Sequence, residues 1–350
     1  MNIEEKQNKL DTFDANGLGA AEAQIFGLPF TYDESEVVIL PIPWEVTVSY
    51  QTGAAKGPKA IFEASMQVDL FDDDLPHAWQ RGIFMQKISA GWKQKNTKLR
   101  KKAVEYIDAL SDGKLTAEHS IVLNEINAEC TALKDWVYAE SKNILDEDKL
   151  LGLLGGDHST PLGYMWALAD KYEEYGILHI DAHADLRDAY EGFNYSHASI
   201  MFNALKIPQV KKLIQVGLRD VCEAEMEIIN NGERRVIGYF NHEIKTALFS
   251  GMSWKIICDQ IIDELPQHVY ISFDIDGLDP KNCPNTGTPV PGGLEYDQAV
   301  YLIQRLVESG RKIIGFDLVE VAPGKDEWDA NVGARLLYKL CNLMMKSQHK

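Results

Sequence analysis

The stretch ILHIDAHAD, residues 177–185, decides the fold class of this chain. Its first four residues form a short, mostly apolar run of the kind found in strands buried on both faces of a parallel sheet. A polar cluster follows where that strand ends. If the chain stays extended there, the i, i+2, i+4 spacing directs Asp181, His183 and Asp185 to the same side. The stretch therefore predicts a buried strand that carries polar chemistry at its carboxyl end.

Apolar runs that end in polar or turn residues recur along the sequence. They lie at 37–40, 150–154, 213–216, 236–239, 268–273 and 312–318. Predicted helices separate many of them, at 118–145, 161–172, 221–230, 242–249, 294–308 and 331–346. Strands that alternate with helices are typical of a parallel sheet covered on both faces. We therefore expect a three-layer α/β/α fold with a mostly parallel sheet.

The domain organisation is predicted to be simple. The 350 residues show neither an internal repeat nor a linker rich in Pro, Gly or Ser. Because an α/β domain of this size can form around one sheet, we expect a single domain over residues 36–350. Residues 1–35 mix charges with small residues, and we expect them to form a loosely packed N-terminal extension.

The composition disfavours several classes of protein. With 35 basic and 53 acidic residues the formal net charge is −18, which argues against nucleic-acid binding and suits cationic ligands. No stretch approaches the apolar length of a membrane span. The N-terminus lacks the apolar segment of a signal peptide, and the five cysteines show no CxxC spacing. The sequence therefore predicts a cytoplasmic protein without a disulfide framework.

Six polar residues follow strands of the predicted sheet and are expected to converge. They are His158, Asp181, His183, Asp185, Asp274 and Asp276. Four carboxylates in one small pocket cannot all stay ionised unless cations neutralise them. Two divalent ions would do so, and carboxylates with some imidazole suit manganese, with nickel, cobalt or iron as alternatives. Two metal ions roughly 3.5–4 Å apart can activate water at neutral pH.

Single polar residues after strands are more often turn or cap residues, and Asp157 and Asp279 fit that simpler interpretation.

The motifs together resemble one family. GGDHS (155–159), DAHADLR (181–187), SFDIDGLDP (272–280) and FDLVEVAP (316–323) are similar to segments of the ureohydrolases, the arginases, agmatinases and guanidinobutyrases. GAAKGPKAI (53–61) and TGTPVPGG (286–293) extend the resemblance to roughly residues 40–345. It implies an arginase-like fold and a two-metal hydrolase that cleaves a guanidino group to urea and an amine. The six residues above would be the manganese ligands, Asp181 and Asp274 would bridge the metals, and Asp185 would also be catalytic.

The same resemblance assigns two further residues. Glu320 follows an apolar strand and matches the Glu that binds the guanidinium, whose planar fork of donors suits a carboxylate. His197 matches a proton-shuttling His, and an imidazole with a pKa near ~6.5 can return a proton to a departing amine. The alternatives are a surface or capping Glu and a surface or capping His.

Arg187 bears on the choice of substrate. Arginases place an Asn two residues beyond the last ligand of the DAHxD segment, where this chain has Arg187, and the runs DLRDAYEG and SHAS resemble agmatinases. We therefore expect agmatine as substrate, with urea and putrescine as products. Arg187 also suits a carboxylate on the substrate, as in guanidinobutanoate. Guanidinase, arginase and formimidoylglutamase activities stay open, because the extension and the segment 96–148 can reshape the pocket.

Two alternative interpretations assign the chain to other classes of protein. The chain could be a catalytically silent, metal-binding regulatory relative, although all six expected ligands are present. It could be a two-metal phosphoesterase, but it lacks a phosphate-binding Gly-rich loop, and Glu320 would repel phosphate. The family resemblance also implies a homo-oligomer, a trimer or a hexamer.

Overall fold

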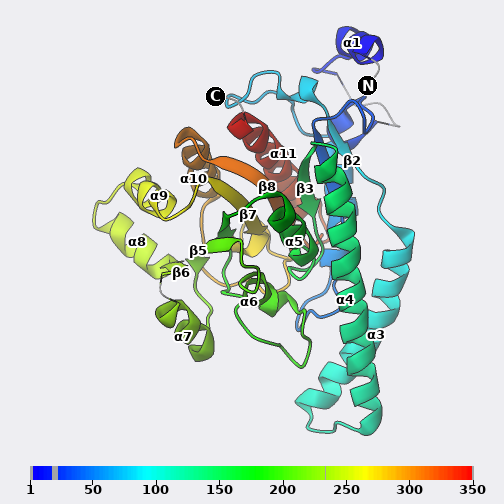
Figure 1. Cartoon of the computed structure of the whole chain (residues 1–350), viewed down its shortest axis with the longest axis vertical. Helices are drawn as coiled ribbons and strands as arrows, with labels where there is room; N and C mark the ends of the chain where they lie inside the picture. The colour runs from blue at the N-terminus through cyan, green and yellow to red at the C-terminus, as the bar shows by residue number, and fades with distance from the viewer. Residues whose placement is uncertain (1–2, 18–22, 233, 349–350) are drawn as a thin grey trace.

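The computed structural model describes residues 3–17, 23–232 and 234–348. Its core is one sheet of eight parallel strands in the order β2-β1-β3-β8-β7-β4-β5-β6 (Figure 1). The strands are β1 Val37–Pro41, β2 Ile83–Met85, β3 Leu150–Leu154, β4 Tyr175–Ile180, β5 Val210–Leu218, β6 Val236–Phe240, β7 His268–Asp274 and β8 Lys312–Val319. The predicted parallel sheet and single α/β fold are confirmed, and β2 is a strand that the sequence analysis did not predict.

Helices cover both faces of the sheet. They are α1 Ile3–Thr12, α2 Gly57–Ser65, α3 Ala90–Ser111, α4 Ala117–Asp146, α5 Leu162–Lys171, α6 Ile200–Ala204, α7 Glu223–Asn231, α8 Asn241–Phe249, α9 Trp254–Asp263, α10 Tyr296–Glu308 and α11 Trp328–Gln348. Buried residues of α2 and α8 to α11 share one core with the sheet, and those of α3 to α6 share the other. The predicted three layers follow from these two cores. Within the described residues, no helix is long and apolar enough to cross a membrane.

The long segment before β3 forms a helical hairpin. Helices α3 and α4 lie side by side at one edge of the molecule and reach beyond the sheet (Figure 1). Ser89 caps α3, because its Oγ accepts the backbone N–H of Trp92, and Thr116 begins α4 with a capping box. Asn96 and Arg100 of α3 hydrogen-bond to Glu45 and Val46, so one face of this helix lies against the loop that follows β1.

The N-terminal extension is packed more firmly than expected. Residues 3–12 form α1, and the side chains of Ile25, Leu28 and Phe30 are almost wholly buried in the core. Apolar residues in a short segment between charged stretches explain the difference, because burial of such side chains stabilises the fold. Residues 1–2 and 18–22 of the extension lie outside the described residues.

Gly156, directly after β3, supports a close approach of two chain segments. A Cβ at this position would lie 1.8 Å from the carbonyl oxygen of Trp44, in the loop after β1. The same carbonyl accepts the backbone N–H of Asp157 at 2.8 Å. Only glycine therefore lets the two segments meet here.

Gly156→Ala is expected to lower the free energy of unfolding by about 3 kcal/mol, because backbone atoms would have to move apart. Gly91→Ala is the matched control, since its Cβ would meet only Ser89 Oγ at 3.8 Å and alanine favours a helix. Urea unfolding followed by circular dichroism measures both. Equal stability of the two variants would show that the loop after β1 moves aside freely.

Candidate active site

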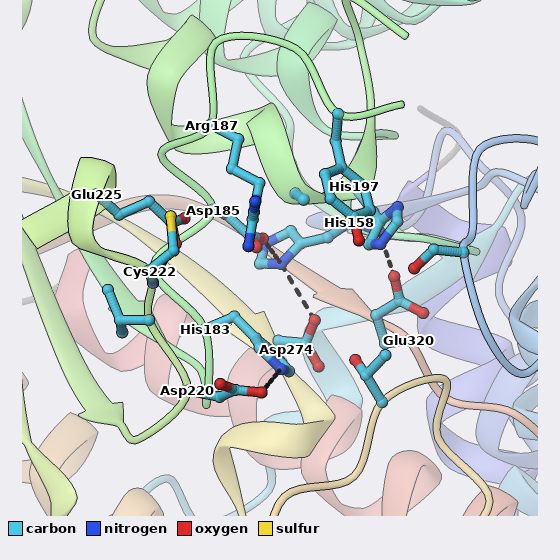
Figure 2. Close-up of a pocket in the computed structure, with 15 residues that line it drawn as sticks. His158, His183, Asp185, Arg187, His197, Asp220, Cys222, Glu225, Asp274 and Glu320 are labelled. Atoms are coloured by element: carbon cyan, nitrogen blue, oxygen red, sulfur yellow. Dashed lines mark hydrogen bonds and ion pairs between the residues drawn. The ribbon is translucent and has the colours of Figure 1, made fainter. Parts of the chain in front are cut away.

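The structure brings the six residues singled out in the sequence to one place at the carboxyl edge of the sheet. Figure 2 labels four of them, His158, His183, Asp185 and Asp274. His158 follows β3, and its Nδ1 lies 3.0 Å from Asp181 Oδ2, 3.2 Å from Asp185 Oδ2 and 3.1 Å from Asp274 Oδ2. These groups come from the ends of three strands, β3, β4 and β7. Parallel strands end at the same edge, so their terminal side chains meet there.

His183 forms a second group beside the first. Its Nδ1 lies 3.1 Å from Asp276 Oδ2 and 3.4 Å from Asp181 Oδ1. Asp181 is thus shared, with one oxygen facing His158 and the other facing His183. All four aspartates are buried, so the cluster places four carboxylates and two imidazoles in a small, nearly dry volume.

The six side chains meet for a different reason from the one that the sequence analysis gave. The chain does not stay extended after β4, which ends at Ile180. Asp185 has a left-handed backbone with φ +54°, and His183 pairs with Asp220 as an isolated bridge. Asp181 and Asp185 therefore face His158, while His183 faces Asp276. Alternation along an extended strand was the wrong reason for the correct grouping.

Three of the carboxylates are held in the same way. Asp181 Oδ1 accepts the N–H of His183 at 2.6 Å, and Asp274 Oδ1 accepts that of Asp276 at 2.9 Å. Asp276 Oδ1 accepts the N–H of Ala182 at 3.1 Å. In each case the other oxygen faces a histidine. Each aspartate is therefore fixed by the backbone through one oxygen and offers the second to the centre of the cluster.

A row of polar residues lies across the strands beneath the cluster. Gln215 of β5 is in register with His179 of β4, His179 with Ser272 of β7, and Ser272 with Asp317 of β8. Gln215 Nε2 lies 2.9 Å from His179 Nδ1, and His179 Nε2 lies 2.7 Å from Asp181 Oδ2. Because the Gln215 amide donates, His179 keeps its proton on Nε2 and donates it to Asp181.

The other half of this row orients His158. Ser272 Oγ donates to Asp317 Oδ1 at 3.1 Å and lies 2.8 Å from His158 Nε2. Since the single hydroxyl proton goes to Asp317, the His158 Nε2–H must donate to Ser272. A neutral His158 then turns the lone pair of Nδ1 toward three carboxylates. Sequence reasoning did not identify this row, although His179 and Ser272 each stand two residues before an identified aspartate in an otherwise apolar strand.

The electrostatics of the cluster fit divalent cations. Burial, and then the charges of Asp276 and Asp181, raise the pKa of Asp274 well above its usual range. Burial and the charge of Asp181 raise the pKa of Asp185 to about 6. Burial lowers the pKa of His158, but the carboxylates of Asp181, Asp185 and Asp274 outweigh it and raise this pKa well above its usual range. Positive charge is therefore favoured between Nδ1 and the carboxylates. A metal ion can supply that charge, and oxygen-rich ligation with imidazole suits Mn²⁺. Among the described residues, two sets of donor atoms could each hold an ion, and both include Asp181. One set is His158, His179, Asp181 and Asp185, and the other is Asp181, His183 and Asp276.

Glu320, after β8, lines the same pocket. Its backbone is left-handed, with φ +62°, and its Oε1 accepts the N–H of His158 at 2.9 Å. Thr286 Oγ1 donates to its carbonyl at 2.9 Å, which helps to hold this conformation. Burial, and then the charge of Asp157, raise the pKa of Glu320 well above its usual range. A cation bound in the pocket would favour its ionised form.

His197 lies at the wall of the pocket, at the start of a short 3-10 turn, His197–Ser199. Burial, and then positive charge on His183 and His158, lower the pKa of His197 to about 3. The imidazole is therefore neutral at pH 7 and stays neutral down to about pH 5, where a free imidazole with a pKa near ~6.5 is largely protonated. Cations bound in the cluster would also lower the pKa of His197, as positive charge on His183 and His158 does.

Arg187 lies across the pocket from Glu320 (Figure 2). Its guanidinium stacks over the ring of Tyr190, 4.7 Å from the centroid. Asp220, Cys222 and Glu225 line the pocket as well, and sequence reasoning did not identify them. Both oxygens of Glu225 accept backbone N–H groups, from Leu186 and Cys222.

Asp157 and Asp279 lie in turns, as the simpler interpretation predicted. Asp157 Oδ1 accepts the N–H of Ser159, and Asp279 Oδ1 accepts that of Lys281. Burial raises the pKa of Asp157 to about 6, with the charge of Glu45 adding to the effect.

Comparison with known proteins agrees with this geometry. N(1)-aminopropylagmatine ureohydrolase of Thermus thermophilus is 30% identical over 312 residues, which cover 89% of this chain and 91% of the relative. Agmatinase of Bacillus cereus is 28% identical over 299 residues, 85% and 88% of the two chains. The fold matches agmatine ureohydrolase of Thermoplasma volcanium with a TM-score of 0.70 at 23% identity, over 97% and 98%.

Fold and cluster define an α/β protein with a carboxylate-rich site at the carboxyl edge of a parallel sheet. The profile of the arginase family matches residues 35–342, and the chain belongs to this family. It is a hydrolase of the ureohydrolase type, as its named relatives are.

Ser272→Ala is expected to weaken divalent-metal binding about 10- to 100-fold, because His158 loses the acceptor that orients it. Ser141→Ala is the matched control, since that buried hydroxyl in α4 has no hydrogen-bond partner in the described part of the chain. Metal content after dialysis against a graded chelator measures both, with close to two ions per chain expected in the parent. Unchanged affinity in Ser272→Ala would mean that the polar row does not support the cluster.

Proposed function

We propose that this protein hydrolyses the guanidino group of a linear guanidine with a cationic tail, releasing urea and an amine. Agmatine, which would give putrescine, is the first candidate. The observation that carries the proposal is the pocket itself, where Glu320 and the cluster lie at one side and further carboxylates line the mouth. The named relatives support the same reaction class.

The six clustered residues would hold two divalent ions, with Mn²⁺ as the proposed metal and Ni²⁺ as the alternative. Ions held there would supply Lewis acidity and a water molecule of lowered pKa. The chain's own contribution is to fix the carboxylates through backbone N–H groups and to exclude bulk water by burial.

Glu320 and His197 would act on the substrate. Glu320 offers Oε2, while Oε1 stays on the His158 N–H, so one oxygen is left for a guanidinium N–H. His197 is neutral at rest, so it accepts a proton before it can give one to the departing amine. A histidine that is protonated before the reaction would instead act first as a proton donor.

Charge at the mouth favours an amine tail. Among the described residues that line the pocket, Arg187 is the single Arg or Lys, and the carboxylates of Asp220, Glu225 and Glu320 lie outside the proposed set of metal ligands. The side chain of Asp220 is 72% exposed, so a second positive group could reach it. Because Arg187 already stacks on Tyr190, it is proposed as a wall of the pocket, not as a clamp for a substrate carboxylate.

The exposed carboxylate of Asp220 also favours a second candidate substrate, N(1)-aminopropylagmatine. This compound is named in the activity of the Thermus relative. Its tail carries one more amine than agmatine, and Asp220 lies at the mouth where the tail would emerge. A trimeric or hexameric assembly and a cytoplasmic location stay predictions of the sequence.

Glu320→Gln is expected to keep its metals and to lose about 2–4 kcal/mol of transition-state stabilisation, because a charge-assisted bond to the guanidinium is lost. Glu327→Gln, an exposed residue of the same loop, is the control. Urea release under saturating metal gives kcat and kcat/KM. A loss below about threefold would assign Glu320 a structural role only.

His197→Ala is expected to slow turnover about 100-fold or more, with partial rescue by added imidazole. Since the pKa of His197 is lowered to about 3, the imidazole stays neutral throughout pH 5–9. The parent and the variant should therefore share the same pH limbs of kcat/KM. An ionisation between pH 5 and 9 that only the variant lacks would show that the environment of His197 differs from this structure.

A substrate panel tests the function directly. We expect kcat/KM for agmatine or N(1)-aminopropylagmatine to exceed that for arginine, 4-guanidinobutanoate and guanidine by at least tenfold. The preference should survive Arg187→Ala. If guanidinobutanoate leads on the parent and collapses in the variant, Arg187 is a carboxylate clamp and the amine-tail proposal is wrong.

A further inference from the structure

A second cavity, of about 510 Å³, lies between α3 and the loop that follows β1. The loop, residues 43–56, forms one wall, and the face of α3 that carries Lys93, Arg100 and Lys101 forms the other. Its lining includes four cationic side chains, with Lys56 as the fourth, against the two carboxylates of Glu45 and Glu105. In a chain with a formal charge of −18, this is a local reversal of sign.

The cationic groups of this cavity are available to a ligand. Among the described residues, neither Lys56, Lys93 nor Lys101 forms an ion pair, although many lysines of this chain do. All three are exposed at the rim. Arg100 lies deeper, and its buried Nε has no hydrogen-bond partner among the residues that the structure describes. An unpaired cationic group favours an anion most where burial reduces screening by water.

The floor of the cavity adds neutral donors. Asn96 is 7% exposed, and its Oδ1 accepts the N–H of Glu45 at 2.7 Å, which leaves the Nδ2 donors of that amide unassigned within the described part of the chain. Glu45 itself is engaged, because its Oε2 accepts the N–H groups of Gly53 and Ala55 at 2.6 and 3.2 Å. Pro43 and Val104 contribute apolar wall.

The loop that forms this cavity also borders the active site. Arg100 Nη1 donates to the carbonyls of Val46 and Val48, and Ser49 lines the pocket beside the metal cluster. The backbone of Thr47 is hydrogen-bonded to the His197 ring. One loop therefore touches Arg100 on one side and the active-site pocket on the other.

We propose that this cavity is an effector site for a small organic dianion, such as a phosphate ester with an apolar ring, and that its occupant adjusts the loop 43–56. The anionic group would lie among Lys93, Lys101 and Arg100, and the apolar body against Pro43 and Val104. Binding would compete with the bonds from Arg100 to the loop carbonyls. The position of Ser49 would then change, and with it the KM for the guanidino substrate.

Calorimetry on the metal-loaded protein tests binding without any turnover, using adenosine 5′-monophosphate, adenosine and inorganic phosphate. The monophosphate is expected to bind at least tenfold more tightly than adenosine or inorganic phosphate. Lys93→Glu and Lys101→Glu should each weaken it at least tenfold. Lys98→Glu, on α3 but outside the cavity lining, should change it less than twofold. No binding, equal binding of adenosine or inorganic phosphate, or an equal loss in Lys98→Glu would overturn the site.

Kinetics then test the link to the active site. The monophosphate should shift the KM for agmatine at least twofold in the parent and in Lys98→Glu, and should leave Lys101→Glu unchanged. An effect that persists in Lys101→Glu would mean competition at the active site, and binding without any shift would overturn the coupling. Failure of urea release in all variants would reject the proposed function while leaving the calorimetric result intact.

Discussion

Repulsion among four buried aspartates is the constraint on which the rest of the site depends. Such groups stay close only if the fold holds them and cations offset their charge. The backbone contributes the first part, since Asp181, Asp274 and Asp276 each keep one oxygen on an N–H group. The parallel sheet brings the histidines to the same place, because its strands end at one edge, and divalent ions bound there would supply the second part. The backbone and the sheet together therefore specify where the four carboxylates lie.

The polar row beneath the cluster explains why the strands must keep their register. Gln215, His179, Ser272 and Asp317 stand opposite one another across four strands and hold Asp181 and His158 in place. A slip of one residue would turn these side chains to the other face of the sheet. The row is fully buried, so a misplaced member would also leave a polar group without a partner. Register and ligand geometry are therefore specified together.

Sequence reasoning reached the parallel sheet because the buried strands are apolar and end in turn residues, and it found the six clustered residues because they follow those ends. It did not find β2, whose three residues are too few for a pattern, or the packing of residues 25–30. It could not foresee the left-handed turn at Asp185, which depends on contacts made after folding. The depressed pKa of His197 is likewise a property of burial beside charged neighbours, which no local motif records.

The clustered residues stand at or shortly after strand ends, whereas Arg187, Tyr190 and Ser49 stand farther along the loops that line the pocket. Loops tolerate change that a buried strand does not. Substitutions at these loop positions can therefore reshape the rim of the pocket while the residues of the cluster keep their places.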